Sequence, residues 1–200
     1  MHRVLFAEFD RVCRTRSAGG RVLEVGSVPT PSSLLNLPAL SGASEKVGIN
    51  LEGASQYRDF KIVAGDANRM DIFADSSFDV VLCNAMLEHD RYFWRTIDEI
   101  HRVTRLGGLI VLGVPGYRPL WGEQFVHRAF RAPLLRALGR NATLNSLSTA
   151  TLTFEVHDAP GDYYRFSEQA VRDVLLGGCR DVDVRSLMLP PRFIGAGVKA

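Results

Sequence analysis

The sequence predicts an α/β fold in which a doubly wound, mostly parallel sheet carries helices on both faces. Two observations predict it: short, apolar, β-branched segments alternate with segments of helical periodicity, and glycines or turn residues separate them. The length of 200 residues fits a single domain spanning residues 1–200. The contents of hydrophobic (46%) and charged (23%) residues are those of a globular chain and argue against disorder or a coiled coil.

The first half of the chain contains four predicted strands. Its predicted elements are, in order, an amphipathic helix over 2–16, a strand over 21–26, a short helix over about 32–40, and strands over 46–50, 60–64 and 78–83. The strand over 78–83 is strongly apolar and β-branched, which is typical of a central strand in a parallel sheet.

The second half continues this alternation after one interruption. Its predicted elements are a helix over 90–105, a strand over 109–114, a helix over 167–176, and strands over 182–187 and 193–199. Gly107 and Gly108 are expected to end the first of these helices, and another glycine pair, 177–178, the second. Ser167 is expected to act as the N-cap of the second helix.

Residues 117–166 interrupt the alternation, and we interpret them as an insertion after the fifth strand. The part over 118–140 is basic and amphipathic, whereas residues 141–153 carry no charge and are rich in Ser, Thr and Asn, as in a mobile loop. An insertion of this length is typical of a lid or a substrate-recognition element. The basic part could lie on a membrane surface, or pack on its own domain with a solvated basic face.

Charge and cysteine content argue against several classes of protein. The formal net charge of +2 is too small to indicate nucleic-acid binding. Cys13, Cys83 and Cys179 lie far apart, so neither a metal site nor a disulfide framework is expected. Acidic residues interrupt the first ten positions, and no apolar run approaches the ~20 residues that span a bilayer. We therefore expect a cytoplasmic protein without stable membrane association.

Polar side chains and glycines follow the predicted strands, where open α/β sheets bind their ligands. A glycine turn at Gly26 lets a ligand approach the backbone closely, although it could also be an ordinary turn between strand and helix. Asn50 ends the second strand and can hold ribose hydroxyls. Asp66 ends the third and can accept a hydrogen bond from an adenine amino group, or can cap a local turn. Together these positions predict a site shaped for adenosine.

Five segments of the chain resemble the class I S-adenosylmethionine-dependent methyltransferases, in the group called type 11. The segments are 22–27 (VLEVGS), 65–70 (GDANRM), 75–84 (DSSFDVVLCN), 86–89 (MLEH) and 99–108 (EIHRVTRLGG). Their order and spacing together make the resemblance specific, because a single short glycine motif is weak. The resemblance implies a Rossmann-like sheet of seven strands whose last strand is antiparallel.

The resemblance also implies a cofactor, S-adenosyl-L-methionine, which becomes S-adenosyl-L-homocysteine, and a small-molecule acceptor methylated on oxygen, nitrogen or carbon. It implies no metal ion. The implied cofactor-binding residues are Glu24, Gly26 and Ser27 around the methionine part, Asn50 and Leu51 by the ribose, Asp66 and Ala67 at the adenine, and Asn84 and Ala85 near the transferred methyl.

Two histidines are candidate catalytic bases. His89 follows the fourth strand and could accept a proton from the acceptor, or could cap the helix that starts nearby. His157 stands beside Asp158 and could form an oriented base.

Tyr163, Tyr164 and Arg165 precede the last helix and are candidate walls of the acceptor site. The alternative is that one tyrosine packs in the core and Arg165 pairs with Asp162.

Two departures from the family pattern keep a second function open. After Gly26 the turn continues with Val28 and Pro29, where the family usually has further glycines, and Pro29 has no N–H to offer a carboxylate. Asn50 is neutral where the family usually has an acid, and Glu52 could substitute for it. The alternative is therefore a non-catalytic protein of this fold that binds or scaffolds. A nicotinamide dehydrogenase would need a fuller glycine fingerprint than this chain has.

Overall fold

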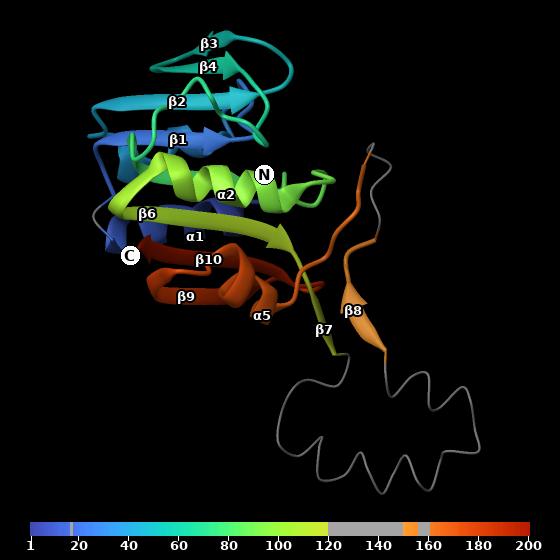
Figure 1. Ribbon diagram of the computed structural model, residues 1–200. Coiled ribbons are helices and arrows are strands. Elements are labelled where there is room, and N and C mark those ends of the chain that lie inside the picture. Colours follow the sequence, from blue (N-terminus) through green and yellow to red (C-terminus); the bar gives the residue numbers. More distant parts are fainter. Residues whose placement is uncertain (17, 120–149, 156–160) are drawn as a thin grey trace, which may run out of the picture.

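Figure 1 shows the computed structural model, which describes residues 1–16, 18–119, 150–155 and 161–200. Its centre is an eight-stranded sheet in the order β3-β4-β2-β1-β5-β6-β10-β9. The strands β4, β2, β1, β5 and β6 are parallel neighbours, and β10 runs antiparallel to β6 and β9. The predicted α/β class, the mostly parallel sheet and the antiparallel last strand are confirmed.

The strands lie where the sequence predicts them, with boundaries that differ by a few residues. They are β1 (Arg21–Val25), β2 (Glu45–Asn50), β4 (Phe60–Ala64), β5 (Phe78–Asn84), β6 (Thr104–Pro115), β9 (Cys179–Leu187) and β10 (Arg192–Lys199). The eighth strand, β3 (Ser55–Tyr57), pairs with β4 in an antiparallel hairpin at the edge of the sheet. The expected count of seven omits this short strand, whose residues show little apolar alternation.

Helices cover both faces of the sheet because successive strand residues point to opposite sides. On one face α1 (Arg3–Thr15) packs with two short 3₁₀ turns, η1 (Leu34–Asn36) and η2 (Pro38–Leu40). On the other, α2 (Phe93–Val103) packs with α5 (Glu168–Ala170) and the π-helical turn η3 (Val171–Leu175), as Figure 1 shows. In β1, for example, Val22 belongs to the first layer of the core and Leu23 to the second.

Two helix predictions need correction. The segment 32–40 forms η1 and η2 instead of one short helix, and Pro38 at the start of η2 has no N–H with which to continue a helix. The helix α2 ends at Val103, not at the glycine pair 107–108, because Thr104 takes an extended conformation and pairs with Phe78 of β5. The predicted N-cap is present: the backbone N–H of Ala170 donates to Ser167 Oγ at 3.0 Å.

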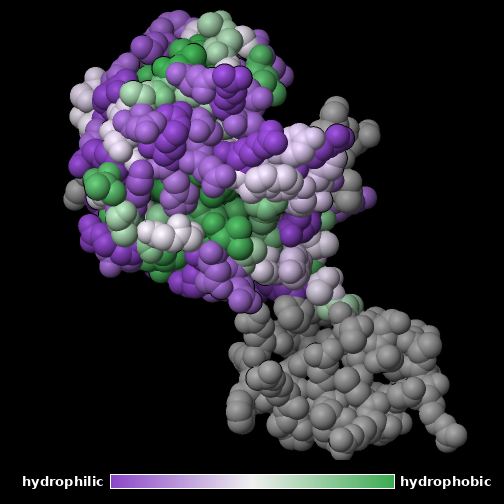
Figure 2. All heavy atoms as spheres, viewed as in Figure 1, coloured by the Kyte–Doolittle hydropathy of each residue, from purple (hydrophilic) through white to green (hydrophobic). Residues whose placement is uncertain are grey.

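The base of the insertion is a two-stranded ladder of β7 (Tyr117–Pro119) and β8 (Thr151–Thr153). The last residues of the predicted loop 141–153 are therefore a strand. Residues 120–149 and 156–160 lie outside the described residues, and most of the predicted lid and of the basic stretch falls there. In the described part of the chain, no helix is both long and apolar enough to cross a membrane. On the face shown in Figure 2, the described surface is mostly hydrophilic.

Candidate functional site

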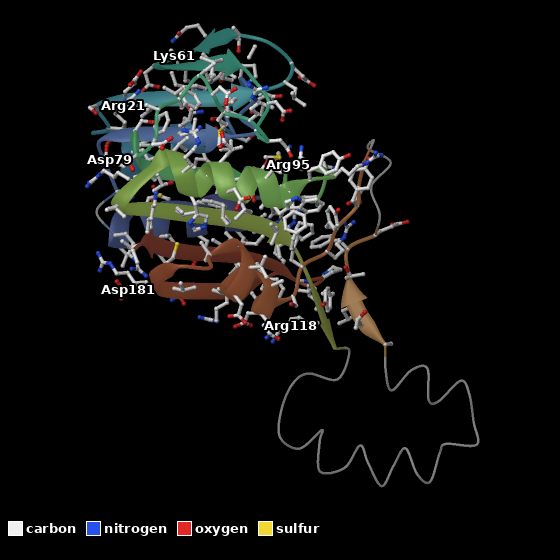
Figure 3. The ribbon with its side chains drawn as sticks, in the orientation of Figure 1. Arg21, Lys61, Asp79, Arg95, Arg118 and Asp181 are labelled. Atoms are coloured by element: carbon white, nitrogen blue, oxygen red, sulfur yellow. The ribbon has the colours of Figure 1, made fainter. Side chains whose placement is uncertain are left out.

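Two cavities open at the edge of the sheet where the parallel strands end, and they meet at the turn after β1. The first has a volume of about 270 Å³ and the second about 440 Å³, and Gly26 lines both. Figure 1 shows the arrowheads of β1, β2 and β6 at this edge, together with the N-terminus. Arg21 and Asp79 lie at the opposite edge, as Figure 3 shows. There the backbone N–H of Arg21 donates to Asp79 Oδ2 at 2.7 Å, and the two side chains form ion pairs with Glu45 and Arg105. The predicted rim is therefore where ligand-sized space lies.

The turn at Gly26 requires glycine. Its φ of +78° lies in the left-handed region, and an added Cβ would stand 2.9 Å from Met86 Cγ. The Gly26 N–H donates to Ile49 O at 3.0 Å, so the turn is tied to β2. The chain therefore turns sharply between the two cavities with no side chain in the way.

The carboxylate of Glu24 is buried beside this turn and is held by the chain itself. It accepts hydrogen bonds from Ser27 Oγ at 2.8 Å, from Ser33 Oγ, and from the Leu34 N–H at 2.9 Å. Burial raises the pKa of this carboxyl, and the three hydrogen bonds act in the opposite direction. Glu24 lines the second cavity, whereas Ser27 lies outside the lining of both and supports Glu24.

Besides Gly26, four of the predicted cofactor-binding residues line the first cavity: Asn50, Leu51, Asp66 and Ala67. Asn50 Nδ2 donates to Ser27 O at 2.7 Å, so this side chain holds the glycine turn as well as facing the cavity. Asp66 Oδ1 accepts from the Asn68 N–H at 2.9 Å, which is the local turn that the sequence left open as an alternative. Glu52 is exposed and lies outside the lining of both cavities.

The second cavity contains Asn84 and Ala85, the two residues expected near the transferred methyl. Asn84 Oδ1 is buried and has no hydrogen-bond partner among the described residues. Ala85 has a φ of +52°, an unfavourable conformation that is common at functional turns. The Oδ1 atom faces Gly113 of β6, where an added Cβ would stand 2.3 Å from it, so glycine at that position leaves room for the amide.

Much of the second cavity comes from residues that the sequence gave no reason to select. Its walls include Met1, His2 and Leu5 from the start of the chain, and Phe154, Met188 and Arg192 from its last quarter. These residues are far apart in the sequence and belong to no local motif. The fold places the beginning of α1 and the beginning of β10 at the same edge of the sheet. These residues therefore come together through the fold alone.

His89 and Tyr163 lie at the first cavity, not at the second. Tyr163 is 48% exposed and packs on Arg91, whose guanidinium lies 5.5 Å from the ring centre and whose Nη2 donates to the phenol oxygen at 3.4 Å. Both candidate residues therefore line the same cavity as Asn50 and Asp66. His157 and Asp158 lie outside the described residues.

The structure gives Tyr164 and Arg165 a packing role, and both lie outside the lining of the two cavities. Tyr164 stacks edge-on against Phe93 at 4.9 Å, and its hydroxyl donates to Arg91 O at 2.9 Å. Arg165 pairs with Asp162, donating from Nη2 to Oδ2 at 2.6 Å, and it also donates to Glu155 O at 2.9 Å. Arg165 thus binds two segments of the chain together, as the alternative interpretation had it.

The sheet order is that of a Rossmann-like α/β fold, and the two cavities lie over the ends of β1, β2, β4 and β5. The sequence agrees with this fold: residues 38–112 match the model of a methyltransferase domain family. This segment is therefore similar to the methyltransferase domain family, and the match covers less than half of the chain.

Individual proteins are also similar to this chain in sequence or in fold. A demethylmenaquinone methyltransferase from Beutenbergia cavernae is 36% identical over 100 residues, covering 47% of this chain and 40% of that protein's length. The fold is similar to a SAM-dependent methyltransferase from Archaeoglobus fulgidus, with a TM-score of 0.64 and 15% identity over 98% of this chain and 93% of that one. It is also similar to 1,6-didemethyltoxoflavin-N1-methyltransferase from Burkholderia thailandensis, solved with S-adenosylhomocysteine bound, with a TM-score of 0.61, 14% identity, and coverage of 98% and 78%.

Proposed function

We propose that this protein transfers a methyl group from S-adenosyl-L-methionine to a small-molecule acceptor. The observation that carries the proposal is the pair of cavities joined at Gly26, over the ends of β1 and β5. An elongated cofactor can lie across this turn, with its two halves in different cavities. The similarity to a methyltransferase named for demethylmenaquinone supports a small-molecule acceptor.

The residues at the turn fit such a cofactor. In the proposed placement, Asp66 and Ala67 contact the adenine, while Asn50 and Leu51 lie at the ribose. The methionine part then reaches past Gly26 toward the second cavity, where Glu24, Asn84 and Ala85 lie.

The main contribution of the protein to this reaction is to align the acceptor with the cofactor. When bound, the cofactor supplies a methyl group that is activated by its sulfonium. The chain has to hold the acceptor in line with this methyl and keep water away, and the apolar side chains of Leu5, Phe154 and Met188 in the lining of the second cavity favour this. A general base is needed only for an acceptor that keeps its proton. His89 and His157 stay candidates for that role, but the described position of His89 is at the first cavity.

Calorimetry with S-adenosylhomocysteine tests the proposal. The parent protein should bind it saturably, and Asp66→Ala should weaken binding by about 1–3 kcal/mol through a lost hydrogen bond in a partly desolvated site. Gly26→Val should abolish binding because the side chain would meet Met86 and fill the turn. Asp71→Ala is the matched control, since Asp71 pairs with the exposed Arg69 and lines neither cavity. Absence of binding to the parent protein would contradict the proposal.

The second candidate function, a non-catalytic protein of this fold, rests on the turn after Gly26. Glu24 is already engaged by Ser27, Ser33 and Leu34, and the segment after β1 forms 3₁₀ turns without a long helix whose N-terminus could receive a carboxylate. The same calorimetry separates the two functions, because only a protein with a degraded site would give no heat. The cytoplasmic location stays a prediction.

A further inference from the structure

A buried pair of opposite charges lies at the far side of the second cavity. Arg192 lines the cavity, and its Nη2 lies 3.2 Å from Glu88 Oε1. The two side chains are 13% and 0% exposed. The guanidinium also lies 5.3 Å from the ring centre of Phe154. In the described part of the chain, these two contacts are the interactions of the Arg192 side chain.

The pair lies on the acceptor side of the proposed cofactor. Arg192 begins β10 and pairs with Pro115 at the end of β6, whereas Gly26 follows β1. Two strands, β5 and β6, lie between β1 and β10, so Arg192 is three strand spacings, or about 14 Å, from the strand that carries the glycine turn. A cofactor that spans the ends of β1 and β5 therefore leaves Arg192 for the acceptor.

The guanidinium of Arg192 can donate further hydrogen bonds in the second cavity. Arginine carries five N–H donors in a planar fork and stays charged at all ordinary pH values. Here one of them makes a long hydrogen bond to Glu88, and Glu88 Oε2 has no hydrogen-bond partner among the described residues. The surrounding wall includes the apolar side chains of Leu5, Phe154 and Met188. A cation in such a setting binds an anion more strongly than it would in water.

We propose that Arg192 binds an ionised oxygen of the methyl acceptor, so that the acceptor is an apolar molecule carrying a phenolate, enolate or carboxylate. This inference rests on the proposed function. In the empty cavity Glu88 balances the charge of Arg192, and when the acceptor is bound the oxyanion takes over part of that role. Burial raises the pKa of the Glu88 carboxyl, and the neighbouring charge of Arg192 acts in the opposite direction. Glu88 lies behind Arg192 and outside the lining of the cavity, whereas Glu24 does line it and is held by Ser27, Ser33 and Leu34.

Three small probes that share one ring test the inference: 4-nitrophenol above the pH at which it ionises, 4-nitrobenzoate, and the neutral 4-nitroanisole. Each is titrated into the full chain at saturating S-adenosylhomocysteine, and its dissociation constant is measured. At least one of the two anions should bind about tenfold or more tightly than the ether, because hydrogen bonds to charged groups have this strength. The anion whose affinity exceeds that of the ether by the larger factor, phenolate or carboxylate, identifies the kind of oxygen that Arg192 binds.

Substitutions then assign the preference to Arg192. Arg192→Gln should abolish the preference for the anion, and Arg192→Lys should keep part of it. Glu88→Gln should increase it, because the competing carboxylate is gone. The matched control is Arg180→Gln, which removes an arginine that is 61% exposed and pairs with Asp181 away from both cavities. If Arg192→Gln does not fold with Glu88 left unpaired, the double variant Glu88→Gln/Arg192→Gln removes both charges and serves in its place.

Equal binding of all three probes to the parent protein, or an anion preference that persists in Arg192→Gln or in the double variant, would overturn the inference. The binding of S-adenosylhomocysteine is measured first and separately. Its absence contradicts the proposed function, whereas a saturable cofactor site without any preference for anions contradicts the role of Arg192 alone.

Discussion

At the scale of single residues, the turn after β1 depends on side chains that bond to the backbone. Asn50 is the clearest case, because its amide donates to Ser27 O at 2.7 Å while its Oδ1 lies 3.3 Å from the Glu52 N–H. An Asp side chain at position 50 would keep an acceptor for the Glu52 N–H but would lose the amide that donates to Ser27 O. The neutral residue that departs from the family pattern therefore has a structural reason in this chain.

We expect Asn50→Asp to destabilise the turn. The substitution removes a hydrogen bond and places an anion against the carbonyl oxygen of Ser27, which should lower the free energy of unfolding by about 1–2 kcal/mol. Denaturant unfolding at neutral pH measures the change, and Glu52→Gln, an exposed neighbour, is the control. An unchanged or higher stability of Asn50→Asp would show that the Ser27 contact has no energetic weight.

The buried carboxyl of Glu24 gives a prediction about pH. Its pKa is raised by burial, so the contribution of this group to stability is present at low pH and is lost as pH rises through the raised folded pKa. Glu24→Gln keeps the shape and can bond to Ser27 and Ser33 without titrating. Relative to Glu24→Gln, the parent should therefore lose stability as pH rises from acid toward neutral. Unfolding free energies of both proteins across this range test it, and a difference independent of pH would contradict it.

At the scale of elements, the loop after β4 is joined to the start of α2 by Asp90. This carboxylate accepts from Asn68 Nδ2 at 3.0 Å, from the Tyr92 N–H at 2.8 Å and from Thr96 Oγ1 at 2.7 Å. Asn68 and Asp90 both line the first cavity. The position of the proposed adenine pocket is thus fixed by a polar junction between two elements.

Asp90→Ala should lower both the free energy of unfolding and the affinity of the first cavity for S-adenosylhomocysteine. Three donors would lose their acceptor, which we expect to cost about 2–3 kcal/mol of unfolding free energy, together with weaker binding of S-adenosylhomocysteine. Thermal unfolding and calorimetry measure the two effects. Asp98→Ala, an exposed acid on α2, should leave both values near those of the parent. If Asp90→Ala behaves like this control, the junction does not hold the cavity.

At the scale of the whole molecule, the sequence predicts the main strands and the glycine turn because each has a local signal: apolar β-branched runs for β1, β2, β5 and β6, and a strand-end glycine at Gly26. It misses β3, which is short, polar and at the edge. It misses the 3₁₀ turns after β1, because the spacing of four buried leucines (Leu34, Leu35, Leu37 and Leu40) resembles that of an α-helix. The acceptor-side wall of Met188 and Arg192 had no local signal, since only long-range packing brings it to Asn84.

One cofactor should lie across Gly26 between the two cavities, and a crystal structure of the protein with S-adenosylhomocysteine would show whether it does. We expect the adenine beside Asp66 and Ala67 in the first cavity, and the sulfur near Asn84 and Ala85 at the mouth of the second. A ligand that lies elsewhere on the chain, or that fills the second cavity with its adenine, would contradict the proposed placement.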